Sequence, residues 1–539
     1  MYAIGGKVMN LILTILRKNK KSIIVVGTLS FITSCVSLVL PIVTKDLFDQ
    51  GIINKNLKIL LISAGILLFL NMFFYILEYA IQKIVVMIEQ KSVMYVRKKV
   101  ISDILAKPLS FFEKYDTEYL VTRINESSGI TNIISSEFWK FIFSIVTMII
   151  ALIYLFKMNV FFGILSILVC CFYIVAILLP MLKIFKINND VMDETAEYNK
   201  KLYNSLHGIS ELKQYNQGKH FSKKIIESVE KIAMLDAEQS NKINFNFNFL
   251  QASIAIINLI VSVIVAVFII IDKATLGDYF LITQYVSLVT APILLFQSFV
   301  IMSLLPFISG IRIEQLNSEE NEEVLTGLSI SNIQTISIEN LCFKYDTKEV
   351  LNGINLSINK NDIVQIIGEN GSGKSTLLKI IMGLYKPEKG RVLVNGKNLE
   401  EYSLKQYRDL IGVIPQKVFL FDSTVKENIR LGNTDLDDAE FEEKLVDFEK
   451  LGIIKNIELN KEVIDNGKNL SGGQIKMIAL ARVLLRKPEV LILDEATAFM
   501  DMALKESFWS VVRNIPDVAI IYISHIKDET IGATKEYHL

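Results

Sequence analysis

The sequence predicts an N-terminal all-α membrane domain of six transmembrane helices, followed by a C-terminal α/β domain. Hydrophobic residues make up 51% of the 539 residues and charged residues only 21%, which is more apolar than a soluble globular protein. The first part of the chain holds six long apolar runs. Beyond them the pattern changes to short β-branched segments alternating with amphipathic stretches, which predicts a domain with a buried sheet.

Each apolar run is long enough to cross a bilayer. A transmembrane helix needs about 20 mostly apolar residues, because lipid cannot satisfy exposed backbone groups. We expect a membrane domain over residues 1–313 with spans at about 22–44, 59–79, 138–156, 158–182, 243–271 and 279–308. An acidic linker at 314–330 then leads to the second domain at 331–539.

Basic residues next to the spans predict their orientation. Arg17, Lys18, Lys20 and Lys21 directly precede the first span, and such residues stay in the cytoplasm. The connections after the second and fourth spans are long and basic, whereas the third and fourth spans are joined by a short one. We therefore expect a multi-pass protein of the cell membrane, surrounded by lipid, with both termini cytoplasmic.

Charge and cysteine content exclude other classes. Lys plus Arg and Asp plus Glu number 57 each, so we expect no nucleic-acid partner. The four cysteines, at positions 35, 170, 171 and 342, show neither a disulfide framework nor metal-ligand spacing. The first apolar run is too long for a secretory signal.

A glycine-rich loop follows the apolar segment 363–367 and precedes the helical pattern 377–382. The strand, loop and helix order is the one a P-loop requires, since its backbone N–H groups and the helix N-terminus converge on phosphate. A glycine turn without a ligand is the alternative. We expect Lys374 to pair with the β- and γ-phosphates of ATP and Ser375 to bind magnesium. The ATP-binding loop comprises Gly368, Glu369, Asn370, Gly371, Ser372, Gly373, Lys374, Ser375 and Thr376.

Two carboxylates end a later apolar strand. Asp494 and Glu495 follow Val490-Leu-Ile-Leu, where two adjacent negative charges are costly without a cation. We predict that Asp494 reaches the magnesium ion and that Glu495 is the general base for the attacking water.

The segment Leu470-Ser471-Gly472-Gly473-Gln474 resembles the signature of ATP-binding-cassette (ABC) proteins. A Ser-Gly-Gly turn at a helix start is a second anion site, and two anion sites in one domain suggest that two copies enclose ATP between them. The resemblance implies that Ser471 and Gly473 contact the γ-phosphate bound to the opposite subunit, and we expect a homodimer.

The same resemblance assigns further residues. It implies that Tyr345 stacks on adenine, that Gln416 contacts magnesium, that His525 contacts the γ-phosphate in a catalytic role, and that Asp501 belongs to the loop after the catalytic carboxylate. Three departures from the family pattern stand out. They are Glu118 in place of glycine, Lys476-Met477 in place of a Gln-Arg pair, and the loop Ala498-Phe499-Met500 in place of Ser-Ala-Leu.

The membrane part is similar to the six-helix half-transporters of the exporter type, with coupling helices expected near 117–125 and 204–215. The resemblance implies a bacterial ABC-type translocating ATPase that exports a substrate by alternating access, using ATP and magnesium. A peptide or peptide-like natural product is the expected substrate. Export of hydrophobic drugs or lipids, import through the same fold, and an ATP-gated sensor or channel are the alternatives.

Overall fold

The computed structural model describes residues 2–539 except 318–320, 323–326, 346–347, 456, 499, 526 and 528–531. Part of the predicted linker and Phe499 of the unusual loop therefore lie outside the described residues. The chain divides into two compact units, one of Met1–Lys107 with Phe111–Asn321 and one of Pro108–Ser110 with Glu322–Leu539. We call them the helical unit and the α/β unit.

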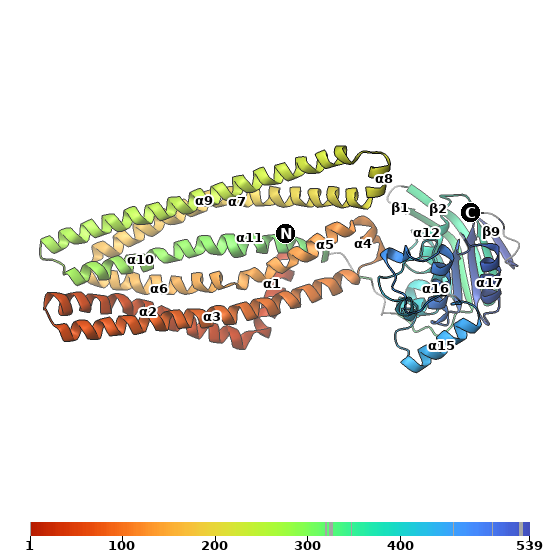
Figure 1. Ribbon diagram of the computed structural model, residues 1–539, viewed down its shortest axis with the longest axis horizontal. Coiled ribbons are helices and arrows are strands. Elements are labelled where there is room, and N and C mark those ends of the chain that lie inside the picture. Colours follow the sequence, from red (N-terminus) through yellow and green to blue (C-terminus); the bar gives the residue numbers. More distant parts are fainter. Residues whose placement is uncertain are drawn as a thin grey trace. The chain divides into compact units, whose positions relative to one another are not determined.

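The helical unit confirms the predicted all-α fold. Among the described residues, six helical runs are long and apolar enough to cross a membrane, and Figure 1 shows their long helices side by side. Its helices are α1 (Tyr2–Lys18), α2 (Lys20–Asp46), α3 (Leu57–Leu105), α4 (Leu109–Lys114), α5 (Thr117–Glu126), α6 (Ser136–Met158), α7 (Val160–His207), α8 (Ile209–Gln214), α9 (Gly218–Ile270), α10 (Leu276–Phe299) and α11 (Leu305–Asn317). π-Helical turns at Leu47–Ile53 and Val300–Leu304 extend α2 and join α10 to α11.

Several helices continue well beyond the apolar runs that predicted them. The helices α3, α7 and α9 have 49, 48 and 53 residues, so each extends past the bilayer as a polar helix. The third and fourth spans meet two residues later than expected. Met158 ends α6, and the Asn159 side chain accepts a hydrogen bond from Phe161 N (2.9 Å) at the start of α7.

The two stretches expected to hold coupling helices both contain a short helix. Residues 117–125 form α5, which belongs to the same helical run as the third span, Thr117–Met158. A separate short helix, α4, follows α3 directly after Pro108. Proline lacks an N–H and restricts the residue before it, so α3 cannot continue through Pro108. The second expected segment, 204–215, does contain a short helix, α8.

Two glycines allow a close backbone crossing inside the helical unit. The 3₁₀ segment Ser127–Ile134 packs on α11. A Cβ atom on Gly129 would lie 2.1 Å from the carbonyl oxygen of Pro306, and one on Gly310 would lie 2.6 Å from Ile130 N. Small residues at such crossings allow helix backbones in membranes to approach closely. Here they join the start of the third span to the end of the sixth.

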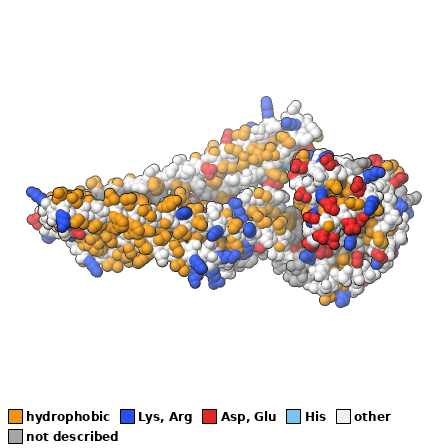
Figure 2. Space-filling view, turned by 60° about the horizontal axis from the view of Figure 1, so that its bottom comes forward, with side chains coloured by type: hydrophobic (Ala, Val, Ile, Leu, Met, Phe, Trp, Pro, Cys, Tyr) orange, Lys and Arg blue, Asp and Glu red, His pale blue; other side chains and the backbone are white. Residues whose placement is uncertain are grey.

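The outer surface of the helical unit is largely apolar. Figure 2 shows a face over which hydrophobic side chains predominate. Large exposed side chains such as Phe69 on α3, Leu182 on α7 and Phe245 on α9 are more than three-fifths exposed. Lipid covers such a surface at no hydrophobic cost, so this exposure agrees with a bilayer environment.

The α/β unit contains two sheets. A five-stranded parallel sheet has the order β6-β7-β8-β3-β9, and a four-stranded antiparallel sheet has the order β2-β1-β4-β5. The strands are β1 (Thr335–Tyr345), β2 (Lys348–Asn359), β3 (Ile363–Ile367), β4 (Lys389–Val394), β5 (Lys397–Asn398), β6 (Ile411–Ile414), β7 (Val490–Asp494), β8 (Ala519–Ser524) and β9 (Lys535–His538). All six residues of β8 are buried, as expected for a parallel strand covered on both faces.

Helices pack against the sheets of this unit and form two hydrophobic cores with them. The helices are α12 (Lys374–Ile381), α13 (Leu404–Asp409), α14 (Val425–Arg430), α15 (Asp438–Lys450), α16 (Gly472–Leu484) and α17 (Met502–Arg513). One core gathers α14, α15, α16 and α17 against strands of the parallel sheet, and the other joins α12 to both sheets. The fold class predicted for this part of the chain is therefore correct.

Candidate nucleotide site

The strand register brings the predicted site residues to one edge of the parallel sheet. Ile367 at the end of β3 is opposite Ser524 of β8, Asp494 of β7 is opposite Ile523, and Ile414 of β6 is opposite Leu493. The four strands therefore end at the same level. Ligands of open α/β folds bind at this carboxyl edge, and four of the predicted segments follow it: the glycine-rich loop, His525, Glu495 and Gln416.

The glycine-rich loop curls around its own lysine. Gly371 and Gly373 have left-handed φ values of 84° and 94°, which side chains rarely adopt. Lys374 Nζ donates hydrogen bonds to the carbonyl oxygens of Gly368 (2.6 Å) and Glu369 (2.7 Å). Ser375, at the start of α12, is exposed. Backbone N–H groups at this helix start are free to meet a phosphate.

The remaining loop residues divide into exposed and inward-facing ones. Glu369 and Asn370 are exposed, whereas Thr376 is buried. Ser372 Oγ is buried without a hydrogen-bond partner. A buried hydroxyl without a partner costs free energy. A ligand or a loop rearrangement that supplied a hydrogen bond to Ser372 Oγ would remove this cost.

Glu495 contacts two other predicted site residues, Gln416 and His525. Its carboxylate accepts a hydrogen bond from Gln416 Nε2 (2.7 Å) and forms an ion-pair contact with His525 Nε2. The residue has a left-handed φ of 48°, which is uncommon for a side chain other than glycine, asparagine or aspartate. The structure thus brings together three predicted residues, which come from three different segments, around one carboxylate.

Ionisation of the neighbouring residue, Asp494, is disfavoured by its surroundings. Burial raises its pKa above the ordinary value, and the charge of Glu495 raises it further, while Lys476, Lys374 and His525 act in the opposite direction. Both effects disfavour the ionised form. A cation placed next to Asp494 would relieve this cost.

The donor set fits magnesium. The Ser375 hydroxyl, the Gln416 amide oxygen and the Asp494 carboxylate are oxygen donors, which Mg²⁺ prefers. No group of three or more His, Cys, Asp or Glu residues within the described ranges is arranged to hold a metal ion. Mg²⁺ commonly uses one or two protein ligands together with substrate phosphates, so the predicted ligands need ATP to complete the site.

The signature turn forms a well-defined helix start. Ser471 caps α16: its hydroxyl accepts from Gln474 N (3.1 Å), and Gln474 Oε1 accepts from Ser471 N (3.0 Å). A Cβ atom on Gly473 would lie 2.2 Å from a methyl carbon of Leu504. Asp501 in turn caps α17 by accepting from Leu504 N (2.8 Å). The signature and the Asp501 loop therefore pack against each other.

The single chain keeps its two predicted anion sites apart. Leu470 is partly buried, and Ser471 and Gly472 are exposed. No hydrogen bond or ion pair between described residues joins the signature 470–474 to the loop 368–376. The P-loop segment and the two carboxylates follow strands that end at one edge of the sheet. The signature turn instead forms the start of α16.

Tyr345 ends β1 in an aromatic cluster that the sequence did not reveal. Its ring lies 5.0 Å from that of Phe343 and 5.6 Å from that of Tyr385, both at nearly perpendicular planes. Edge-to-face contacts of this kind fix a ring's orientation. Tyr385 follows α12 and lacks any periodic pattern, so only the tertiary contact identifies it.

Lys476 was noted only as a departure from the family pattern. Its side chain is 5% exposed, and Nζ donates to the carbonyl oxygens of Pro415 and Gln416, both at 2.8 Å. Burial lowers the pKa of Lys476, while Asp494 and Glu495 act to raise it. The sequence held one signal, a lysine within an otherwise apolar helical stretch. It did not show what the lysine contacts.

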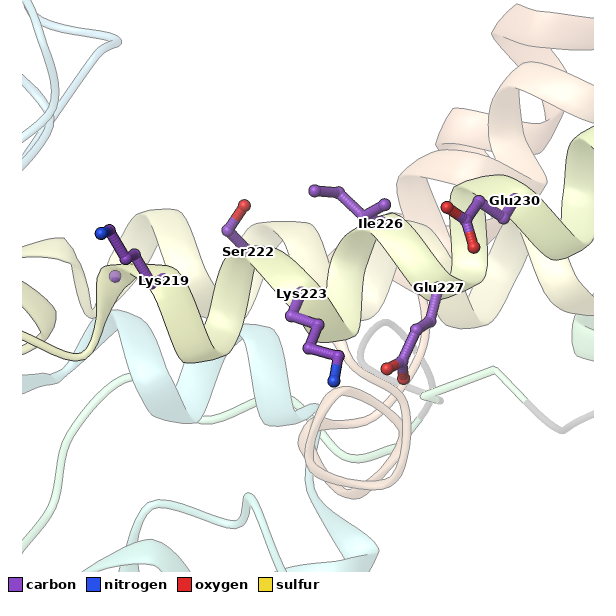
Figure 3. A pocket seen from close by; sticks show the side chains of 7 residues that line it. Lys219, Ser222, Lys223, Ile226, Glu227 and Glu230 are labelled. Carbon is purple, nitrogen blue, oxygen red and sulfur yellow. The ribbon is translucent and has the colours of Figure 1, made fainter.

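A groove on α9 lacks this combination of site residues. Figure 3 shows this groove, with Lys219, Lys223, Glu227 and Glu230 along it. All of its lining residues lie on one helix, with two lysines followed along the helix by two glutamates. That arrangement is typical of a solvated helix face.

Two family models match the chain. The ABC transporter transmembrane region matches residues 23–293, half of the chain, and the ABC transporter model matches residues 351–498. The chain belongs to the ABC transporter family. The second match includes the P-loop, Gln416, the signature and both carboxylates but stops before Asp501 and His525 and begins after Tyr345. Those three positions rest on geometry and motif order.

Two of three similar proteins align along most of the chain, and the third aligns along about half of it. A lactococcin-A transport/processing ATP-binding protein of Lactococcus lactis is 28% identical over 95% of this chain and 72% of its own length. A putative multidrug export ATP-binding/permease protein of Staphylococcus aureus is 28% identical over 89% of this chain and 85% of its own. The microcin-J25 export protein of Escherichia coli is 32% identical over 47% of this chain and 44% of its own.

A solved structure shares the fold. It is a bacterial Atm1-family ABC exporter with ATP bound, with a TM-score of 0.83, 17% identity, and coverage of 97% of this chain and 93% of its own. This ABC transporter is thus a six-helix half-transporter of the exporter type, a multi-pass membrane protein that binds ATP and couples its hydrolysis to transport.

Proposed function

We propose that this ABC transporter exports a peptide or peptide-like natural product across the cytoplasmic membrane as a homodimer. The observation that carries the ATPase mechanism is the position of the Glu495 carboxylate, which lies between Gln416 and His525 at the edge where the P-loop begins. A general base must be held within hydrogen-bond reach of the water it activates. These contacts orient Glu495 for that role.

The other residues have complementary roles in this proposal. Lys374 leaves the carbonyls of its own loop to pair with the β- and γ-phosphates, Tyr345 stacks on adenine, and His525 contacts the γ-phosphate. Ser375, Gln416 and Asp494 hold magnesium, which neutralises charge on the phosphates. Residues 368–373 bind phosphate through their backbone N–H groups.

The exposed signature turn supports a dimer. Ser471 and Gly473 lie at a helix start with no hydrogen bond to the P-loop among the described residues. A second copy would bring its own P-loop to this turn, with Asp501 at the junction. ATP then joins the two α/β units, and their closure switches the membrane cavity between inward and outward access, with both termini in the cytoplasm.

The peptide assignment is supported by the relatives that align along most of the chain. The lactococcin-A transporter covers 95% of it. A second candidate, export of hydrophobic drugs, is supported by the Staphylococcus aureus relative named as a putative multidrug exporter. Lipid export, import and an ATP-gated channel remain alternatives that the experiment below distinguishes.

The test uses the full chain in inside-out proteoliposomes. We expect ATP-dependent accumulation of a labelled bacteriocin-like peptide, and we expect Glu495→Gln to abolish both this uptake and ATP hydrolysis. Glu506→Gln, an exposed glutamate of α17, is the matched control and should retain both. Peptide flux that persists at full rate in Glu495→Gln would contradict pumping.

The substrate class needs a second measurement. Peptides should stimulate ATP hydrolysis in nanodiscs, whereas hydrophobic dyes and short-chain lipids should not. Stimulation by dyes alone would favour the drug-export alternative. Efflux from inside-out vesicles, opposite to the expected uptake, would indicate import.

A further inference from the structure

A buried lysine on the signature helix holds the loop that carries Gln416. Lys476 lies two residues after Gln474 and is 5% exposed. Its Nζ donates to two consecutive carbonyls, those of Pro415 and Gln416, at 2.8 Å each. Burying an ammonium group is costly unless its hydrogen bonds are made. Both bonds go to one short stretch of backbone, so the lysine fixes that stretch relative to α16.

That backbone in turn places the side chain next to the catalytic carboxylate. Gln416 lies in an exposed loop just beyond the end of β6. Its amide nitrogen donates to Glu495 Oε2 (2.7 Å), and the other carboxylate oxygen contacts His525. A continuous series of contacts therefore runs from Lys476 through the Gln416 backbone and side chain to Glu495.

This series of contacts starts near the capped N-terminal end of α16. Ser471 and Gln474 cap the helix reciprocally, and Lys476 follows Ser471 by five residues, about 7.5 Å along the axis. A displacement of the signature turn therefore moves Lys476 with it. Since the carbonyl oxygens of Pro415 and Gln416 accept hydrogen bonds from that lysine, the displacement reaches the Glu495 carboxylate through the Gln416 side chain.

We infer that Lys476 is a positioning residue that holds Gln416 against Glu495 and thereby couples the signature turn to the catalytic carboxylate of the same chain. The inference rests on the proposed function, in which Glu495 is the base and the signature contacts ATP held by the other subunit. Lys476 then links the two ATP sites of the dimer, because closure around one nucleotide aligns the base that acts on the other.

The test measures ATP hydrolysis by the full chain in nanodiscs. Lys476→Met removes both hydrogen bonds and keeps the apolar stem. We expect kcat to fall roughly tenfold to a hundredfold, as for a misplaced catalytic group, with the KM for ATP unchanged and with cooperativity in ATP lost. Lys476→Gln retains an amide donor for one carbonyl and should recover most of the lost kcat.

A double-mutant cycle asks whether Lys476 acts through Gln416. In a Gln416→Ala background the side-chain link to Glu495 is already gone, so Lys476→Met should add little further loss of kcat. A full-sized additional loss in that background would overturn the inference. So would a wild-type kcat in Lys476→Met.

A matched control separates positioning from loss of stability. Arg408 also donates hydrogen bonds to two consecutive carbonyls, those of Met382 (3.0 Å) and Gly383 (2.7 Å), and it forms an ion pair with Glu322 (2.6 Å); none of these three contacts involves Gln416 or Glu495. Arg408→Met should lower the melting temperature and leave kcat per nucleotide-binding site unchanged. Sites are counted by titration with a fluorescent ATP analogue. An equal loss of kcat in Arg408→Met and Lys476→Met would reduce the lysine to a structural role.

Failure of the proposed mechanism and failure of the Lys476 role give different results. ATP hydrolysis that survives Glu495→Gln overturns the proposed mechanism and this inference with it. An inactive Glu495→Gln together with a fully active Lys476→Met overturns only the coupling role of Lys476.

Discussion

Replacing Gly129 by alanine tests the close crossing between the third and sixth spans. The added Cβ atom would lie 2.1 Å from the carbonyl oxygen of Pro306, whereas carbon and oxygen atoms in contact are about 3.3 Å apart or more. The obstructing atom belongs to the backbone, so no side-chain rotation can relieve the clash. The two segments must separate by more than about 1 Å, which opens the packing around them.

The cost follows from this forced separation. Overpacking typically costs about 1–3 kcal/mol, and the gain in helix propensity from glycine to alanine returns up to about 1 kcal/mol. We expect a net loss of about 1–2 kcal/mol, which lowers the unfolding midpoint of the helical unit by roughly 2–3 °C. Gly310→Ala should act similarly, because its Cβ would lie 2.6 Å from Ile130 N.

The two tryptophans make the assay specific. Trp139 packs against the same core as Ile130, and Trp509 is buried in the α/β unit. In a Trp509→Phe background, the fluorescence of Trp139 follows thermal unfolding of the helical unit.

Gly65→Ala provides the matched control. Gly65 lies in α3, and its Cβ would have no heavy atom within 4 Å, so this substitution should be neutral or slightly stabilising. Equal unfolding midpoints for Gly129→Ala and Gly65→Ala would contradict the predicted clash with the Pro306 carbonyl, since both changes add one methyl group to a helical segment of the same unit.

Two further predictions concern the α/β unit. Tyr345→Ala should raise the KM for ATP about tenfold or more, since base stacking contributes about 1–3 kcal/mol, while Tyr345→Phe should keep the wild-type KM in the same ATPase assay. Asp362 has a lowered pKa because hydrogen bonds from Lys535 (2.6 Å) and the Asn359 backbone outweigh its burial. It therefore stabilises the folded state above the ordinary aspartate pKa of about 4, and this contribution disappears as the pH falls through the lowered value. Lys535→Met should cost about 0.5–1 kcal/mol at pH 7 and less once Asp362 is protonated, when only the hydrogen bond from Lys535 to the Ser357 carbonyl is lost. Trp509 fluorescence in a Trp139→Phe background measures both costs, and an equal cost at both pH values would contradict this assignment.

Much of the fold was predictable because its causes are local. Apolar runs of about 20 residues identify membrane spans, and the six spans need no tertiary contact to be recognised. Helix ends were less predictable, because α3, α7 and α9 continue as polar helices beyond the apolar runs. The short helix α4 was not predicted, because only Pro108 marks the place where the preceding helix stops.

The site residues were identified in the same way, from motifs whose order along the chain is informative. The motifs identified Lys374 at the end of the glycine-rich loop that follows β3, and Asp494 and Glu495 at the end of β7, because such local patterns can be recognised in the sequence. They could not name Lys476 as a contact of Gln416 or place Tyr385 beside Tyr345. These pairs are 60 and 40 residues apart in the chain, and only the folded sheet and helices bring them together.

Local patterns in the chain were enough to predict the six spans, the α/β domain and the ATP-binding motifs, because hydrophobic periodicity and glycine-rich turns involve only a few neighbouring residues. Tertiary structure decided which of those residues touch. It aligned the ends of β3, β6, β7 and β8, brought Gln416 and His525 to Glu495, and left the signature turn separate from the P-loop. Strand register and burial fix those distances, and both depend on contacts between segments far apart in the chain.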